Sequence, residues 1–259
     1  MSAPKNAFKA RLLAGEVQHG LWMSLASPVA AEALSLLGFD WLMFDTEHAP
    51  VEIAALQPLL QAAQGGQSAC VARPAWNDRV LIKRMLDVGV QTILVPFVQD
   101  AEEAAAAVAA TRYPPEGVRG VAGATRASRY GQAQDYLRTA GDEICVLVQV
   151  ETGAALERLE EIARVPGVDG VFIGPSDLSA SLGHLGNPGA EEVQEILREA
   201  ARRIDACGRA PGILATNAAD ALRYRRWGYR FIAASLDIGL LVGGARQLLD
   251  RLTAEGLSP

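Results

Sequence analysis

Two apolar runs of the sequence end in acidic side chains that together could hold one metal ion. Glu151 follows the run CVLVQV, and Asp177 follows VFIGPS. Two carboxylates with no histidine or cysteine beside them suit a hard divalent ion such as Mg²⁺ or Mn²⁺. Two protein ligands also leave coordination positions for water and substrate, so the pair predicts a catalytic metal site. The alternative is structural: Glu151 begins a helix, where the dipole favours an acid, and Asp177 caps the next segment.

His48 and Arg73 end two further apolar runs and could move a proton and hold negative charge. Of the three histidines, only His48 stands at such an end, after Asp45 and Glu47. Histidine titrates near neutral pH, which suits a general base. A guanidinium is a poor base, so we expect Arg73 to hold an anion or a developing oxyanion. The polar residues at the end of any one of these apolar runs could also belong to an ordinary solvated loop, and a lone histidine is commonly structural.

The segment Gly174-Pro175-Ser176-Asp177 offers backbone donors beside the acidic pair. Ser176 and Asp177 each contribute a backbone N–H group, whereas proline has none. A turn of this kind can cradle a carboxylate next to a metal ion. The alternative is an ordinary turn with no ligand.

Lysine is scarce, and this argues against two kinds of amine chemistry. The chain has only Lys5, Lys9 and Lys83, the first two in a polar leader and the third inside a helical pattern. Schiff-base and pyridoxal phosphate (PLP) enzymes need a lysine amine in a pocket, so we expect neither. The sequence also has no G-x-G-x-x-G fingerprint and no P-loop, so we expect no bound NAD.

Composition and charge exclude further classes of protein. The 259 residues carry a net charge of −6 with a sequence pI of about 5.2, which argues against nucleic-acid and anionic-membrane partners. Three widely spaced cysteines predict reduced thiols, with no disulfide framework or zinc site. The N-terminal segment lacks the apolar run of a signal peptide, and no stretch reaches the roughly 18 apolar residues of a membrane span. We therefore expect a cytoplasmic protein.

Short apolar runs alternate with amphipathic patterns along the whole chain, which is typical of βα units around a parallel sheet. Polar residues at helix starts support this division, namely Ser27, Asn77, Asp100, Thr152 and Asn217. The predicted strands are Val17–Leu25, Phe39–Asp45, Ser68–Ala72, Val90–Val95, Ile144–Val150, Val168–Ile173, Pro211–Ala215 and Tyr229–Ala233.

Eight such strands predict an α/β fold, a single-domain (β/α)₈ barrel over residues 1–259. Barrel strands end at one rim, so the polar strand ends and two long connections, 113–134 and 176–190, would meet there. A doubly wound sheet is the alternative, but it usually needs a glycine-rich turn after the first strand. Residues 1–15 form a leader or helix, and residues 237–253 form a final helix with Leu241, Ala245, Leu248 and Leu252 on one face.

The order and spacing of seven blocks resemble those of one enzyme family. The blocks are FDWLMFDTEHAP, VARPAWND, KRMLDVGVQTILVPFVQ, TRYPPEGVRG, CVLVQVETGAALE, VDGVFIGPSDLSASLGHLGNP and APGIL. They resemble the HpcH/HpaI aldolases, class II metal-dependent pyruvate aldolases of which 4-hydroxy-2-oxoheptanedioate aldolase is typical. The resemblance runs from about Leu21 to Leu249.

This resemblance implies a role for each residue that matches the family's blocks. It makes Arg73 the residue that stabilises the pyruvate enolate, and His48 the general base, acting through a water and oriented by Asp87. Asp87 lies just before Gly89 at a helix end, where the dipole disfavours an acid, and this oddity fits a functional role across a subunit interface. The alternative is an ordinary solvated acid. The implied metal ligands are Glu151 and Asp177, and the implied substrate-binding residues are Trp22, Arg73, Gln149, Gly174, Pro175, Ser176, Asp177 and Leu214.

The resemblance also implies an activity and an assembly. The activity is cleavage or formation of a 4-hydroxy-2-oxo acid from pyruvate or hydroxypyruvate and an aldehyde, with Mg²⁺, Mn²⁺ or Co²⁺, in aromatic compound catabolism. The implied assembly is a homo-oligomer in which the eighth helix is swapped between barrels, built into a hexamer as a trimer of dimers. Two other functions stay open: an acyl-CoA lyase of the citrate-lyase β type, and a non-catalytic barrel that binds oxo acids. The loop around 123–126 looks shorter than in the heptanedioate enzymes, so the aldehyde is not specified.

Overall fold

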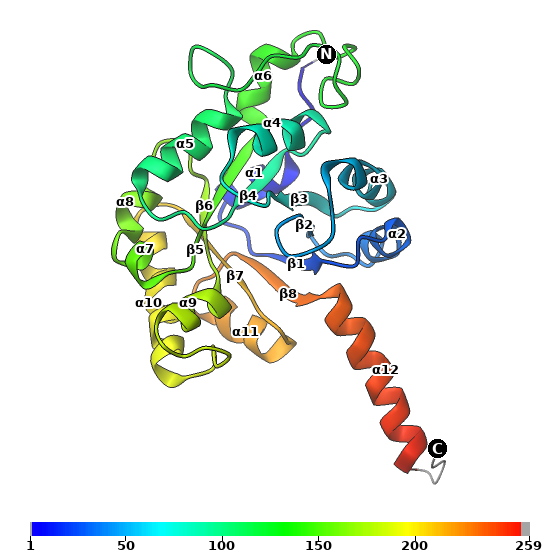
Figure 1. The fold of residues 1–259 in the computed structure, drawn as a ribbon, viewed down its shortest axis with the longest axis vertical. Coiled ribbons are helices and arrows are strands. Elements are labelled where there is room, and N and C mark those ends of the chain that lie inside the picture. The colour runs from blue at the N-terminus through cyan, green and yellow to red at the C-terminus, as the bar shows by residue number, and fades with distance from the viewer. Residues whose placement is uncertain (1, 255–259) are drawn as a thin grey trace.

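The computed structural model describes residues 2–254 and shows a closed barrel of eight parallel strands (Figure 1). Each strand pairs with the next one along the chain, and β8 closes the barrel on β1. This confirms the predicted single-domain (β/α)₈ fold and excludes an open doubly wound sheet. The strands are β1 Gln18–Met23, β2 Trp41–Asp45, β3 Ala69–Arg73, β4 Thr92–Val95, β5 Cys145–Val150, β6 Gly170–Ile173, β7 Ala210–Leu214 and β8 Phe231–Leu236.

Helices surround the strands, as Figure 1 shows. Aliphatic side chains from both layers form the larger hydrophobic core, between the barrel wall and the helices. The helices are α1 Ala7–Leu13, α2 Pro28–Ser35, α3 Ile53–Ala63, α4 Arg79–Asp87, α5 Ala101–Thr111, α6 Tyr136–Glu143, α7 Gly153–Glu157, α8 Leu159–Ala163, α9 Pro175–Ser181, α10 Glu191–Ala206, α11 Ala218–Arg226 and α12 Asp237–Ala254.

Aromatic side chains fill the barrel interior, and α1 contributes one of them. Phe8 of α1 makes edge-on contacts with Trp41 and Phe231, at ring-centroid distances of 6.1 and 6.2 Å. Trp41 and Phe231 begin β2 and β8, so Phe8 plugs the N-terminal end of the barrel. Glycine makes room for these rings, because a Cβ on Gly20 would lie 2.1 Å from the Trp41 ring.

Replacement of Phe8 by alanine is expected to lower the free energy of unfolding by about 3–5 kcal/mol, because it opens a cavity under the barrel. Urea denaturation of the variant measures this change. Leu13→Ala is the matched control on the same helix, because its side chain is 64% exposed. We expect the control to change stability by less than about 0.5 kcal/mol. Equal effects of the two substitutions would contradict the role of Phe8 as a plug.

Four of the five predicted helix starts are confirmed, and one is wrong by a residue. The side chains of Ser27, Asp100, Thr152 and Asn217 each accept a hydrogen bond from the first turn of a helix. The helix predicted to begin at Asn77 instead has Asp78 as its N-cap, and the Asp78 carboxylate accepts from the backbone N–H groups of Val80 and Leu81. The side-chain amide N–H of Asn77 instead donates to the backbone oxygen of Glu103.

The two long connections and the last helix follow the prediction, with differences in detail. The connection 113–134 is long as expected, but α6 follows it directly. Part of the connection 176–190 is helical, because α9 starts at Pro175, and proline is favoured in the first turn of a helix. The helix predicted over 237–253 exists as α12 and runs to Ala254.

The last helix, α12, projects away from the barrel (Figure 1). Among its described residues only Asp237 is buried, and the Asp237 carboxylate accepts hydrogen bonds from the backbone N–H groups of Ser24 and Leu25. The predicted apolar face with Leu241 and Leu248 is therefore exposed in the single chain. No helix within residues 2–254 is long and apolar enough to span a membrane.

Candidate functional site

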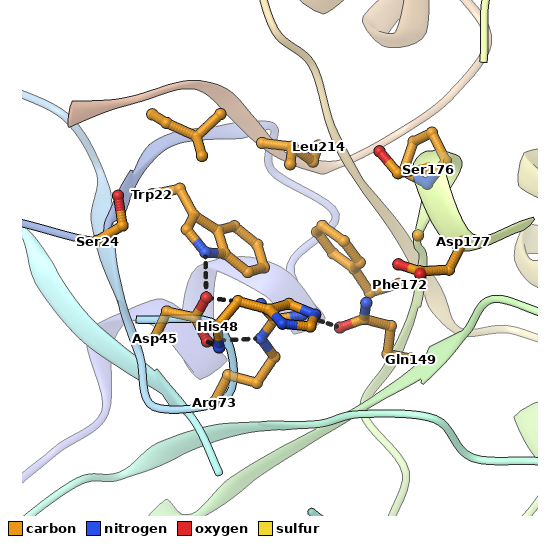
Figure 2. Close-up of a pocket in the computed structure, with 13 residues that line it drawn as sticks. Trp22, Ser24, Asp45, His48, Arg73, Gln149, Phe172, Ser176, Asp177 and Leu214 are labelled. Carbon is orange, nitrogen blue, oxygen red and sulfur yellow. Dashed lines mark hydrogen bonds and ion pairs between the residues drawn. The ribbon is translucent and has the colours of Figure 1, made fainter. Parts of the chain in front are cut away.

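A cavity of about 470 Å³ opens where the C-terminal ends of the strands meet. Figure 2 shows side chains directed into this space from the end of β3 (Arg73), from the loop after β2 (His48) and from the first turn of α9 (Asp177). The cavity contains every residue predicted to bind substrate, together with His48. Its lining is Trp22, Ser24, Asp45, His48, Arg73, Gln149, Phe172, Gly174, Pro175, Ser176, Asp177, Leu214 and Leu236.

Two neighbouring carboxylates fix the Arg73 guanidinium. The Nε and Nη2 atoms of Arg73 donate to the two oxygens of Asp45 at 2.9 and 2.7 Å. The Nη1 atom forms an ion pair with Glu47 Oε2 at 2.7 Å and lies 3.5 Å from Gln149 Oε1. The indole N–H of Trp22 donates to Asp45, and the guanidinium lies 4.7 Å from the centre of the Trp22 ring. Arg73 is thus a rigid cation at the floor of the cavity.

Prediction from the sequence missed that Asp45 and Glu47 hold Arg73. The signal was present in the strand register, because Asp45 and Arg73 are directly paired residues at the ends of β2 and β3. Paired residues of parallel neighbours point to the same side of a sheet. An acid and an arginine in these two positions therefore predict an ion pair inside the barrel mouth.

The environment shifts the pKa values of the two acids that hold Arg73 in opposite directions. Burial by itself would raise the pKa of Asp45, but the hydrogen bonds and charge of Arg73 hold this pKa below its ordinary value. For Glu47, burial prevails over the attraction of Arg73 and raises the pKa, and the charges of Asp45 and Asp177 act in the same direction. The site therefore keeps Asp45 ionised against Arg73 and carries an excess of acidic groups.

Glu151 lies beneath the cavity, with both carboxylate oxygens held by N–H donors. Its Oε1 accepts from the backbone N–H of Phe97 at 2.9 Å, and its Oε2 accepts from Nε2 of Gln149 at 2.5 Å. Burial raises the pKa of Glu151 to about 7, and the negative charge of Asp177 adds to this shift. Two acids that repel one another in this way form a site that a cation would stabilise.

The donor set is compatible with a hard divalent cation. Carboxylates are the preferred ligands of Mg²⁺ and Mn²⁺. The local charge is negative, since Glu47, Glu151 and Asp177 repel one another and Arg73 pairs, within the described part of the chain, only with Asp45 and Glu47. Among residues 2–254 no group of three or more histidine, cysteine or acidic side chains is arranged for a metal. Glu151 and Asp177 would therefore supply two protein ligands and leave the other positions to water or substrate.

Gly174 allows Glu151 and Gln149 to approach the end of β6. A Cβ at this position would lie 2.5 Å from Glu151 Oε2 and 3.0 Å from Gln149 Nε2. We expect Gly174→Ala to displace the Glu151 carboxylate and to weaken metal binding by about 10–100-fold, the usual effect of disturbing the groups that hold a metal ligand. Calorimetric titration with Mn²⁺ measures this loss. Gly123→Ala is the control for general effects, because a Cβ there would meet nothing within 4 Å and Gly123 does not line the cavity. Comparable affinities in both variants would contradict the role of Gly174.

The structure brings His48 to the rim of the cavity but does not bring Asp87 to it. The His48 side chain is 68% exposed, and its Nε2 lies 4.0 Å from Glu47 Oε1. Asp87 ends α4 and forms an ion pair with the buried Arg119 at 2.8 Å. The predicted pairing of His48 with Asp87 is therefore not made within the described part of one chain.

The predicted carboxylate cradle lies at the start of α9. Ser176 and Asp177 occupy the first turn of this helix, where backbone N–H groups have no acceptor within the helix. Both residues are exposed to the cavity, beside the buried Pro175. The arrangement offers two backbone donors to an anionic group next to the acidic pair. Lys5, Lys9 and Lys83 are all absent from the lining of this cavity.

Comparison with known proteins places the chain among aldolases. The family model for HpcH/HpaI aldolase/citrate lyase matches residues 18–243. A pyruvate aldolase of Rhizobium etli is 52% identical over 251 residues, which is 97% of this chain and 99% of that protein. A 4-hydroxy-2-oxo-heptane-1,7-dioate aldolase of Salmonella dublin is also 52% identical, over 97% of this chain and 96% of that protein. The crystal structure of an HpcH/HpaI aldolase/citrate lyase family protein from Burkholderia cenocepacia J2315 is similar with a TM-score of 0.94 and 41% identity, covering 96% of this chain and 100% of that one.

Proposed function

The chain belongs to the HpcH/HpaI aldolase/citrate lyase family and is an aldolase, that is, a carbon–carbon lyase. We propose that it is a metal-dependent enzyme that acts on 4-hydroxy-2-oxo acids. The reaction cleaves or forms the acid through the enolate of pyruvate or hydroxypyruvate and an aldehyde. One observation carries this proposal: a rigid, buried Arg73 lies in the same cavity as Asp177, with Glu151 beneath it. An enolate needs this combination, because its oxygen carries the charge that develops during the reaction.

Glu151 and Asp177 would hold the cation, with Mg²⁺, Mn²⁺ or Co²⁺ as candidates. A divalent ion bound there supplies Lewis acidity that draws charge onto the 2-oxo oxygen of the substrate. The protein fixes Glu151 through Phe97 and Gln149, so that this carboxylate needs little rearrangement to bind. Lysine amines have no part in this mechanism.

Arg73 and the start of α9 bind the pyruvate part of the substrate. The backbone N–H groups of Ser176 and Asp177 donate to the substrate carboxylate, and Gly174 and Pro175 shape the turn that presents them. Arg73 holds the enolate oxygen with guanidinium N–H groups that are already oriented by Asp45 and Glu47. The walls are completed by Trp22, Leu214 and Gln149.

His48 is positioned to move the proton in the cleavage step. Its exposure at the rim allows a water to connect the imidazole with the 4-hydroxyl group of the substrate. Removal of this proton breaks the C3–C4 bond, releases the aldehyde and leaves the enolate, which is then protonated at C3. Aldol addition is the reverse sequence. A cytoplasmic location and a role in aromatic compound catabolism belong to the same proposal.

The exposed apolar face of α12 supports a homo-oligomer. A helix that leaves the barrel with its leucines uncovered needs a partner surface, and we propose that α12 is exchanged between two copies, with three such dimers in a hexamer. Asp87 would then orient His48 across an interface between two copies. Sedimentation of a Leu241→Asp/Leu248→Asp variant is expected to show smaller species than the wild type. Leu185→Asp, at an exposed leucine elsewhere, is the control, and an unchanged assembly of the α12 variant would contradict the proposal.

Proton exchange tests the proposed activity without knowledge of the aldehyde. We expect the enzyme with Mg²⁺ or Mn²⁺ to exchange the methyl protons of pyruvate for deuterium, followed by ¹H NMR. EDTA should abolish the exchange, and added metal should restore it. A protein that only binds oxo acids would leave the methyl signal unchanged, and an acyl-CoA lyase would require a thioester. A retro-aldol screen over 4-hydroxy-2-oxo acids of different length and terminal charge then identifies the substrate.

A further inference from the structure

The loop after β4 places Phe97 against Glu151 in an unusual backbone conformation. The φ angle of Phe97 is +56°, in the left-handed region that disfavours residues with a Cβ and favours glycine. Non-glycine residues stay in this region only where several contacts fix them, and such positions cluster at functional sites. Phe97 therefore needs contacts that hold it.

Backbone contacts tie this loop to the residues that hold the acidic pair. The N–H of Phe97 donates to Glu151 Oε1 at 2.9 Å, and the N–H of Val98 donates to the backbone oxygen of Gln149 at 3.0 Å. The side-chain amide of Gln99 (Nε2) donates to the backbone oxygen of Phe97 at 3.0 Å. Gln149 itself donates to Glu151 Oε2, so the loop supplies one donor of this carboxylate and is hydrogen-bonded to the backbone of the residue that supplies the other.

A ring stack with Trp76 holds the side chain of Phe97. The two ring centroids are 5.8 Å apart, and the ring planes differ by 28°. Trp76 is 55% exposed and Phe97 is 36% exposed, so burial in the core does not hold either ring in place. Trp76 belongs to the loop between β3 and α4, three residues after Arg73. The stack therefore joins the loop that follows Arg73 to the loop that contacts Glu151.

We propose that Trp76 and Phe97 are positioning residues for the metal ligand Glu151. The stack keeps Phe97 in its left-handed conformation, and this conformation directs the Phe97 N–H at Glu151 Oε1. Neither residue lines the cavity, so neither touches the substrate. The inference rests on the proposed function, because it assigns Glu151 to a divalent cation.

The substitutions Phe97→Ala and Phe97→Gly distinguish a positioning role of Phe97 from a contribution to packing alone. Phe97→Ala loses the stack but keeps the Cβ that disfavours a φ of +56°, whereas Phe97→Gly loses the stack and adopts this φ freely. We expect Phe97→Ala and Trp76→Ala to weaken Mn²⁺ binding by about tenfold, the lower end of the effect of outer-shell groups on metal affinity. We expect Phe97→Gly to bind Mn²⁺ within about twofold of the wild type, and Trp76→Ala to have no further effect in the Phe97→Gly background.

Calorimetric titration of the metal-free, full-length variants with Mn²⁺ measures these affinities, and circular dichroism checks the fold. Tyr130→Ala is the matched control, since Tyr130 is exposed with the same φ of +56° but lies outside the cavity. Equal affinities of the wild type, Phe97→Ala and Trp76→Ala would overturn the inference, as would a Phe97→Gly variant as weak as Phe97→Ala. If the wild type bound Mn²⁺ no better than Glu151→Gln, the proposed metal site and with it the proposed function would be contradicted. Failure of the proposed function is thus distinguished from failure of the inference about Trp76 and Phe97, in which the wild type still binds Mn²⁺ more tightly than Glu151→Gln.

Discussion

Replacement of Arg73 by alanine is expected to lower kcat/KM for retro-aldol cleavage by about 10²–10³-fold, the effect of removing one donor to an oxyanion. The reason is geometric, because Asp45 and Glu47 already hold the guanidinium in a buried position. The cation therefore meets the developing enolate without reorganisation. Steady-state kinetics with a 4-hydroxy-2-oxo acid that the wild-type enzyme cleaves measure this loss.

Two further variants separate the charge of Arg73 from its geometry. Arg73→Lys keeps the positive charge but cannot make the paired hydrogen bonds to Asp45, so we expect it to recover only part of the lost activity. Arg203→Ala removes an arginine whose ion pair with Glu160 lies outside the cavity, and we expect kinetics like those of the wild type. Since Arg73→Ala leaves the buried Asp45 unpaired, its kinetics are measured well below the melting temperature of the variant. Unchanged turnover in folded Arg73→Ala protein would refute the assignment.

Replacement of either member of the acidic pair is expected to remove nearly all activity. Glu151→Gln and Asp177→Asn keep the shape of each side chain but take away one negative charge and one anionic ligand. We expect pyruvate proton exchange to fall by at least about 10²-fold in each variant, because the loss acts on the metal ligands directly and exceeds most outer-shell effects. The double variant should be little worse than either single one, since both act on the same ion. Normal exchange rates in the single variants would exclude the pair as the metal site.

The raised pKa of Glu151 adds a stability measurement to the same variants. In the metal-free protein, burial and the charge of Asp177 raise this pKa from 4.5 to about 7. The folded state then binds a proton that the unfolded state releases, so the free energy of unfolding falls as pH rises from 4.5 to 7. Glu151→Gln removes this dependence, and we expect it to be more stable than the wild type at pH 8 without metal. Urea denaturation at several pH values measures the difference, and a wild type as stable as Glu151→Gln at pH 8 would contradict it.

The positions of strand-end residues could be predicted from the sequence, because the βα rhythm fixes where each strand stops. Arg73, Gln149 and Asp177, which were named from the ends of predicted strands, all line the cavity. The ion pair of Asp45 with Arg73 could also have been predicted from the sequence, because these residues are paired at the ends of the neighbouring strands β2 and β3. Side chains at the ends of adjacent parallel strands meet for reasons of geometry alone.

Other features depend on tertiary contacts that leave no local signal. Phenylalanine gives no hint of a positive φ, so the conformation of Phe97 could not be predicted. Asp87 is an acid at the C-terminal end of a helix, which the sequence already marked as unusual. Its partner Arg119 could not be predicted, because Arg119 comes from the irregular segment 112–135. The last helix, α12, was predicted correctly, but the sequence of one helix does not specify a partner surface for its exposed leucines.

Titration of the metal-free enzyme with Mn²⁺, followed by electron paramagnetic resonance of the free ion, tests most directly whether Glu151 and Asp177 share one cation. The wild type is expected to bind a single Mn²⁺ per chain, and Glu151→Gln and Asp177→Asn are each expected to lose this site. Asp87→Asn, an acid outside the cavity, is expected to retain it. Wild-type affinity in both Glu151→Gln and Asp177→Asn would contradict the account.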